Sequence, residues 1–171
     1  MGILAPSGAG KTTLFRLLMG LEAADRGVVE TYGAVISAVF QEDRLCEKLN
    51  AADNVRIVNG STVKDGKILK DLTTLLPEES LQLPICALSG GMKRRAALVR
   101  AMTSPGDLVL LDEPFTGLDE ENREAAIRYI DRQLGDRILI IASHEPSDFQ
   151  KLKVHSLLVR EENGNWEQLE V

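Results

Sequence analysis

Residues 5–13 read Ala-Pro-Ser-Gly-Ala-Gly-Lys-Thr-Thr and follow a short apolar run at residues 2–4. Glycines have no Cβ, so this segment can curl with its backbone N–H groups pointing inward, around an anion at the N-terminus of the next helix. Lys11 adds a cation suited to β- and γ-phosphates, and Thr12 adds a hydroxyl suited to Mg²⁺. The stretch therefore predicts a loop that binds a nucleoside triphosphate. The alternative interpretation is a glycine-rich turn between a strand and a helix.

The loop departs at one position from the usual pattern G-x-x-x-x-G-K-[ST], because Ala5 stands where the first glycine is expected. Holding an alanine at positive φ would cost about 1–2 kcal/mol. The residues suited to phosphate contact, Gly8, Gly10, Lys11 and Thr12, are all present. The prediction of a phosphate-binding loop therefore stands, although the loop alone does not indicate which reaction follows.

Length and composition limit the classes of protein that fit. A chain of 171 residues with 44% hydrophobic content can bury one good core, so a single domain is expected. The formal charge of −6 argues against nucleic-acid binding, and the basic residues 93–95 are interpreted as a solvated helix face. Cys46 and Cys86 lack metal-ligand spacing and are interpreted as reduced cytosolic thiols. No apolar run approaches the ~20 residues that span a bilayer, so any membrane association is expected to be peripheral.

Apolar periodicity predicts alternating strands and helices along the chain. The expected strands are residues 2–4, 28–32, 34–40, 108–111, 138–142, 156–159 and 166–171, and the expected helices are 10–19, 51–58, 63–76, 90–102, 120–134 and 146–152. This order predicts an α/β fold with a mostly parallel core sheet flanked by helices. Residues 42–85 have mixed charge and are bounded by turn formers, so they are predicted to be a small helical subdomain inserted into a core of residues 1–41 and 86–171.

Four polar residues stand at the ends of predicted strands, where ligands of parallel sheets bind. Gln41 follows one strand, Asp112 and Glu113 follow the next, and His144 follows a third. Asp112 is placed to support Mg²⁺, and Glu113 could polarise a water in line with the γ-phosphate. The alternative is that the acids belong to an exposed turn and that the histidine is an ordinary polar residue at a strand end.

Five segments, in this order, resemble the ATP-binding-cassette (ABC) ATPases. They are APSGAGKTT at 5–13, the glutamine of VFQEDRL at 39–45, LSGGM at 88–92, LVLLDEPFTGLD at 108–119 and the histidine of IIASHE at 140–145. The resemblance spans residues 1 to about 150. LSGGM is its discriminating part, because other phosphate-loop families share the lysine loop and the acidic strand end.

The resemblance implies a role for each matching residue. The ATP phosphates would be held by Ser7, Gly8, Ala9, Gly10, Lys11, Thr12 and Thr13. The residues that would hold Mg²⁺ are Thr12, Gln41 and Asp112. Glu113 would be the general base for the attacking water, and His144 would contact the γ-phosphate, so that the implied catalytic set is Glu113, His144 and Gln41.

The LSGGM segment implies a second subunit. Ser89, Gly90 and Gly91 would contact the ATP of that subunit, and Asp119 would lie at the dimer interface. A helix beginning near Gly90 offers a second anion-binding helix end, so a two-fold dimer with two ATP molecules between its subunits is expected. The sequence around Gln41 is similar to that of importers, which implies membrane-spanning permease subunits as partners and a cytoplasmic location on the inner face of the cell membrane.

The chain also departs from the family pattern. The family normally carries an antiparallel β-subdomain, with an aromatic residue that stacks on adenine, before the phosphate loop, whereas this sequence begins at the loop's own strand. We therefore expect weak ATP binding with little preference over GTP. The leading hypothesis is the ATP-hydrolysing subunit of a transporter, which energises solute transport through ATP-driven dimerisation. The alternatives are a degenerate cassette that binds nucleotide without turnover and a soluble cassette ATPase outside transport.

Overall fold

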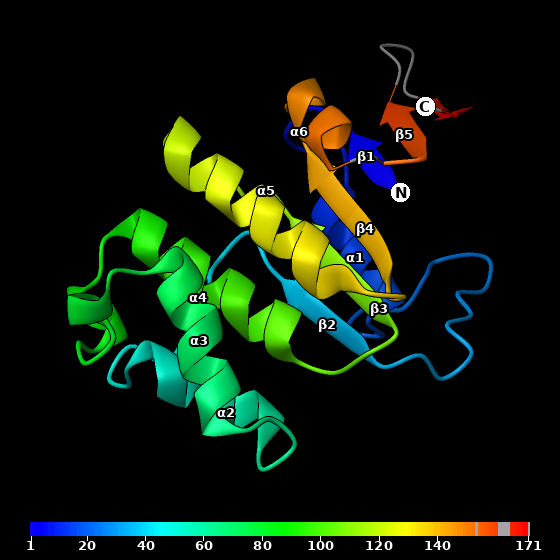
Figure 1. Ribbon diagram of the computed structural model, residues 1–171. Coiled ribbons are helices and arrows are strands. Elements are labelled where there is room, and N and C mark those ends of the chain that lie inside the picture. The colour runs from blue at the N-terminus through cyan, green and yellow to red at the C-terminus, as the bar shows by residue number, and fades with distance from the viewer. Residues whose placement is uncertain (153, 161–164, 171) are drawn as a thin grey trace. The chain divides into compact units, whose positions relative to one another are not determined.

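The computed structural model describes residues 1–152, 154–160 and 165–170, and the chain divides into two compact units (Figure 1). The first, which we call the sheet unit, comprises Met1–Gln41, Gly106–Pro114 and Arg137–Val171. The second, the helical unit, comprises Glu42–Pro105 and Phe115–Asp136. Residues 86–105 and 115–136 thus belong to the same compact unit as the helices of residues 42–85. The predicted boundary of an inserted subdomain at residue 85 stays a prediction.

The described residues of the sheet unit form six strands and two helices. They are β1 (Gly2–Leu4), β2 (Ile36–Val39), β3 (Leu108–Asp112), β4 (Ile138–Ser143), β5 (Ser156–Arg160), β6 (Trp166–Glu170), α1 (Lys11–Leu18) and α6 (Pro146–Lys151). The strand order is β2-β3-β4-β1-β5-β6, and every neighbouring pair is parallel except β5 and β6. Register pairs Leu4 with Ser143 and Asp112 with Ala142, so these strands end at one edge of the sheet.

The core of the sheet unit explains why α1 lies where it does. All five residues of β3 are buried, as expected for a central parallel strand. Leu14, Phe15 and Leu18 recur at helical spacing on α1 and pack against a cluster that includes Ile3 and Leu110. This packing fixes the N-terminus of α1 beside the carboxyl ends of β1 and β3.

The helical unit contains four α-helices. They are α2 (Ala51–Asn59), α3 (Asp65–Leu75), α4 (Gly90–Thr103) and α5 (Glu120–Leu134). Helix α4 contacts the other three, and most of its second half is buried. The side chain of Asn50 caps α2, and Gly135 ends α5, which spans the residues predicted from sequence.

One predicted strand is wrong. Residues 28–32 form no strand, and no strand of the described residues pairs with them. Val28 and Tyr32 are almost fully exposed, and Tyr32 has a φ of 51°, which interrupts an extended backbone. The predicted strand 34–40 is observed only over Ile36–Val39, and the last residue of the predicted strand 166–171 lies outside the described residues.

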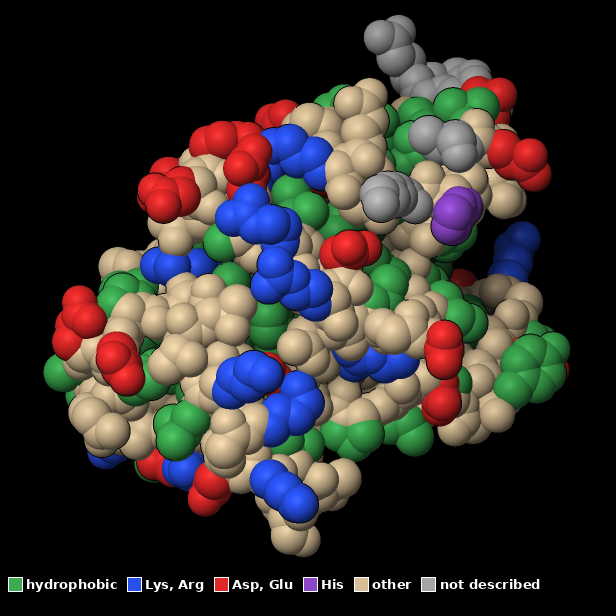
Figure 2. Space-filling model, in the orientation of Figure 1, with side chains coloured by type: hydrophobic (Ala, Val, Ile, Leu, Met, Phe, Trp, Pro, Cys, Tyr) green, Lys and Arg blue, Asp and Glu red, His purple; other side chains and the backbone are tan. Residues whose placement is uncertain are grey.

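None of the helices in the described part of the chain has both the length and the apolar character needed to cross a bilayer. Acidic and basic side chains both lie over the face drawn in Figure 2, in keeping with 26 acidic and 20 basic residues in the sequence. The surface charge is therefore mixed on this face.

Candidate active site

The loop of residues 5–13 takes its shape from Gly8 and Gly10. Gly8 has a φ of 80° and Gly10 a φ of 92°, both in the left-handed region that glycine enters without strain. Helix α1 begins directly afterwards at Lys11, so its free N–H groups point out of the helix toward the loop. Ala5 is not among the positive-φ residues of the described chain, and it therefore fits the first glycine position without the cost considered above.

Lys11 is buried at the end of the loop. Its ammonium donates hydrogen bonds to the carbonyl oxygens of Ala5, at 2.6 Å, and Pro6, at 3.2 Å. It also forms an ion pair with Glu113, with 3.2 Å between Nζ and Oε1. The side chains of Lys11 and Glu113 are only 7% and 13% exposed. The loop therefore places its cation directly against the second acid of the β3 end.

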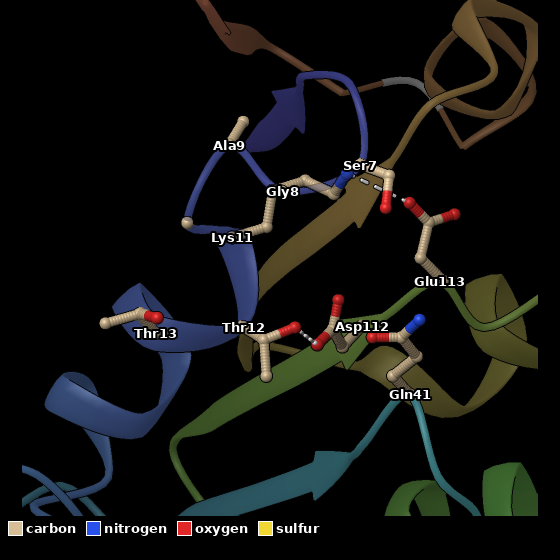
Figure 3. Close-up of a pocket in the computed structure, with 10 residues that line it drawn as sticks. Ser7, Gly8, Ala9, Lys11, Thr12, Thr13, Gln41, Asp112 and Glu113 are labelled. Atoms are coloured by element: carbon tan, nitrogen blue, oxygen red, sulfur yellow. Dashed lines mark hydrogen bonds and ion pairs between the residues drawn. The ribbon is translucent and has the colours of Figure 1, made fainter.

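Thr12 and Asp112 point toward each other across the site (Figure 3). The Thr12 hydroxyl donates to Oδ2 of Asp112 at 2.5 Å. A cavity of about 250 Å³ opens beside this pair, and Gln41, which follows β2, reaches the same cavity. The residues that line it are Ser7, Gly8, Ala9, Gly10, Lys11, Thr12, Thr13, Gln41, Asp112 and Glu113.

The donor set of this cavity fits a magnesium ion. A threonine hydroxyl, a glutamine amide and an aspartate carboxylate are hard oxygen ligands, the class that Mg²⁺ prefers. Mg²⁺ is usually bound by one or two carboxylates together with substrate phosphates. Asp112 is nearly fully buried and already aligned with Thr12, so the oxygens are held in place by the fold.

Glu113 has an unusual backbone conformation for its residue type. Its φ is 49°, in a region that costs a non-glycine residue roughly 1–2 kcal/mol. Its N–H donates to the carbonyl of Ala142 at 2.9 Å, which holds this turn against β4. The carboxylate lies between Lys11 and His144, with 2.8 Å between Oε2 and the histidine Nδ1. The strained turn therefore aims the acid into the cavity.

The remaining predicted site residues lie in the helical unit and do not line this cavity. Ser89 caps α4, its hydroxyl accepting from the N–H of Met92 at 3.3 Å, and Gly90 and Gly91 form the first turn. Asp119 caps α5. The backbone N–H of Asn122, and then its side-chain amide, lower the pKa of the Asp119 carboxyl. The structure thus gives Ser89 and Asp119 a capping role, separate from any contact with nucleotide.

Comparison with known proteins assigns the family. The sequence model described as "ABC transporter" matches residues 1–116, more than half of the chain. The chain belongs to the ABC transporter family. As predicted from the five segments, it is an ABC transporter ATP-binding domain.

Curated relatives of this ABC domain are named as import ATP-binding proteins. The chain is 35% identical to the aliphatic sulfonates import ATP-binding protein SsuB 1 of Rhodococcus jostii over 95% of its own length and 68% of the relative's. It is 34% identical to the sulfate/thiosulfate import ATP-binding protein CysA 1 of Shewanella oneidensis, over 99% of the chain. It is 37% identical to the taurine import ATP-binding protein TauB of Pseudomonas aeruginosa, over 71% of the chain. The chain spans about half the length of the last two proteins.

Two solved structures share the fold. The dimeric, post-hydrolysis structure of the ATP-binding cassette MJ0796 bound to ADP and Pi is 19% identical and matches with a TM-score of 0.82, covering 99% of this chain and 84% of that chain. RNase-L Inhibitor matches with the same TM-score at 24% identity, covering 99% of this chain and 33% of that one. The predicted α/β fold with a mostly parallel sheet is therefore confirmed.

Two features of this ABC site were not predicted from sequence. The first is the ion pair of Lys11 with Glu113, whose partners are 102 positions apart, so that no local pattern indicates it. The second is the buried contact of Ser143 with Asp148, next to His144. The one sequence signal for this contact is that Ser143 directly precedes His144 and that Asp148 follows Ser143 by five positions.

Proposed function

We propose that the chain is the ATP-binding and ATP-hydrolysing subunit of an ABC importer. The proposal depends chiefly on one observation, the convergence of Lys11, the Thr12–Asp112 pair and Glu113 on a single cavity. His144 does not line this cavity, but its imidazole contacts the Glu113 carboxylate. These groups supply a phosphate cradle, metal ligands and a carboxylate base, which together suit transfer of the γ-phosphoryl group of ATP to water.

The phosphates of ATP bind to the N–H groups of the loop and of the first turn of α1, with Lys11 beside them. Lys11 is held by Glu113 in this structure, so binding brings a phosphate into competition with that carboxylate for the ammonium. Thr12, Gln41 and Asp112 would hold Mg²⁺, which when bound offsets the negative charge of the β- and γ-phosphates. Glu113 is then available to take a proton from the attacking water, and His144 contacts the γ-phosphate.

We further propose that two copies, or this chain and a second cassette, close on two ATP molecules. Helix α4 has 14 residues, and its N-terminus carries Ser89 and two glycines, so it suits an anion. The phosphates bound at the α1 N-terminus would not also use the α4 N-terminus of the same chain. The α4 N-terminus would instead bind the ATP held by the other subunit. Asp119 then lies at the interface between the subunits. MJ0796 was solved as a dimer, which agrees with this arrangement.

The proposed partners on the membrane side are permease subunits, with the cassette on the cytoplasmic face. The relatives are named for import. Residues 39–45 and 52–55 resemble the importer sequence around the glutamine loop, where membrane subunits dock. Co-purification of the chain with a polytopic membrane protein from its native cells is the expected result. Recovery of the chain without one would favour a cassette ATPase outside transport.

A phosphate-release assay tests the enzymatic proposal. The chain should release phosphate from ATP in the presence of Mg²⁺ and stop when EDTA is added. Lys11→Ala should be inactive in the same assay, while Arg16→Ala, a change of the same charge on α1 outside the cavity lining, should retain activity. Binding of ATP without release, in preparations confirmed to be dimeric, would show a nucleotide-binding module without turnover.

A further inference from the structure

The turn after β4 carries His144 on a largely exposed side chain. The imidazole is 56% exposed, and its recorded partners are Oε2 of Glu113, 2.8 Å from Nδ1, and the exposed Glu145 carboxylate, 3.8 Å from Nε2. An exposed side chain with few contacts takes its position mainly from its backbone. The residues that fix this turn therefore decide whether the imidazole meets Glu113.

The turn is held by a buried hydrogen-bond chain. The Ser143 hydroxyl donates to Oδ2 of Asp148 at 2.6 Å and accepts from the backbone N–H of Glu145 at 3.0 Å. Ser143 and Asp148 are each only 2% exposed. A hydrogen bond to a carboxylate is about twice as strong as one between neutral groups, and burial strengthens it further. The hydroxyl thus links the residues on both sides of His144 to a fixed anion.

Asp148 is itself immobilised by the packing of α6 on the sheet. Phe149, which follows it, is 1% exposed and lies so close to β1 that a Cβ on Gly2 would be 2.4 Å from its ring. The N–H of Asp148 donates to the carbonyl of Glu145 at 3.1 Å, which closes the turn from the other side. The carboxylate is therefore a rigid reference point five residues after the serine.

We propose that Asp148 and Ser143 are positioning residues for His144. Asp148 holds the Ser143 hydroxyl, the hydroxyl holds the Glu145 N–H, and the turn between them presents the imidazole to Glu113 and to the γ-phosphate of ATP. This inference rests on the proposed role of His144 in hydrolysis. It assigns no contact with ATP to either Ser143 or Asp148.

Steady-state hydrolysis by the dimeric protein tests the proposal with four variants. Ser143→Ala and Asp148→Asn should lower kcat roughly tenfold to a hundredfold, because a small misplacement of a catalytic group has effects of that size. The KM for ATP should stay within about twofold, since neither residue lines the nucleotide cavity. Ser143→Thr, which keeps the hydroxyl, should recover most of kcat. Gln150→Ala, an exposed change on the same helix, is the control and should match wild type.

Combination with His144→Ala separates a positioning role from a general loss of folding. If Asp148 acts through the histidine, Asp148→Asn should lower kcat little further in the His144→Ala background. Equal losses in both backgrounds, or a Ser143→Ala protein as active as the control, would overturn the inference while leaving the proposed ATPase intact. An unchanged kcat in His144→Ala alone would instead refute the role of His144, and the inference with it.

Discussion

Replacement of Glu113 by glutamine should separate ATP binding from ATP hydrolysis. The substitution keeps the side-chain shape and removes the charge that serves both as the proposed base and as the partner of Lys11. Loss of a general base typically lowers the rate about 10²–10⁴-fold. We therefore expect single-turnover hydrolysis by Glu113→Gln to fall by at least a hundredfold.

The same substitution should tighten ATP binding. The Lys11–Glu113 pair has 7% and 13% exposed side chains, which places it between an exposed pair, worth up to about 1 kcal/mol, and a fully buried one, whose disruption costs about 3–5 kcal/mol. Lys11 retains its hydrogen bonds to the carbonyl oxygens of Ala5 and Pro6 when the ion pair breaks. We therefore take the free-energy cost of separating Lys11 from Glu113 as about 1–2 kcal/mol. Glutamine removes that cost and the repulsion between carboxylate and phosphate. We therefore expect Glu113→Gln to bind ATP about tenfold more tightly than wild type, which corresponds to 1.4 kcal/mol.

Calorimetric titration with ATP and a rapid-quench measurement of hydrolysis check both parts. Glu22→Gln removes the same charge from the sheet unit outside the cavity and should match wild type in both assays. A hydrolysis rate for Glu113→Gln within threefold of wild type would exclude Glu113 as the base. Weaker ATP binding by Glu113→Gln would refute the competition between Glu113 and phosphate for Lys11.

Three further predictions concern stability. Gly2→Ala should lower the free energy of unfolding in urea by about 1–3 kcal/mol, because its Cβ would overlap Phe149. Gly66→Ala, which has open space on α3, should raise that free energy by about 0.5–1 kcal/mol. Equal values for the two variants would contradict the packing argument. Ala5→Gly should give no gain and lower that free energy by about 0.4–1 kcal/mol, since Ala5 is unstrained; a gain would show strain at Ala5. Asp119 has a lowered native pKa, so its charge stabilises the fold above the ordinary aspartate pKa, and that contribution is lost as the pH falls through the lowered value. The melting temperature of wild type should therefore exceed that of Asp119→Asn at pH 7 and converge with it in acid, and a pH-independent difference would argue against this role.

Capping residues and apolar runs in the sequence predicted the elements that they bound or form. Helix α5 begins after a capping aspartate and ends at Gly135, so its bounds follow from residue type alone. Strand β3 is an unbroken apolar run ending in an acid, which indicates both a buried strand and a polar residue at the sheet edge. Strand ends and the glycine-rich loop indicated Gly8, Gly10, Lys11, Thr12, Gln41, Asp112 and Glu113, which line the cavity, whereas Ser7, Ala9 and Thr13 were implied only by the family resemblance. His144 also follows a strand but does not line the cavity.

The failures involve interactions between distant residues. The segment 28–32 has the composition of a strand, but a strand needs a partner, and propensity does not say whether one is present. The ion pair of Lys11 with Glu113 requires the strained turn at Glu113, and a φ of 49° at a glutamate is not visible in the sequence. Asp148 could not be linked to Ser143 until α6 was known to pack its Phe149 onto Gly2.

The most direct test of the proposed ATP sandwich is a mixture of two inactive variants. Lys11→Ala disables the phosphate loop, and Ser89→Arg disables the signature that we propose acts on the ATP of the other subunit. Each variant alone should release almost no phosphate. In a mixed dimer one site pairs an intact loop with an intact signature, so random exchange of subunits should restore about a quarter of the wild-type rate. No activity in confirmed mixed dimers would contradict the account, because each cassette would then have to hydrolyse its ATP with its own residues alone.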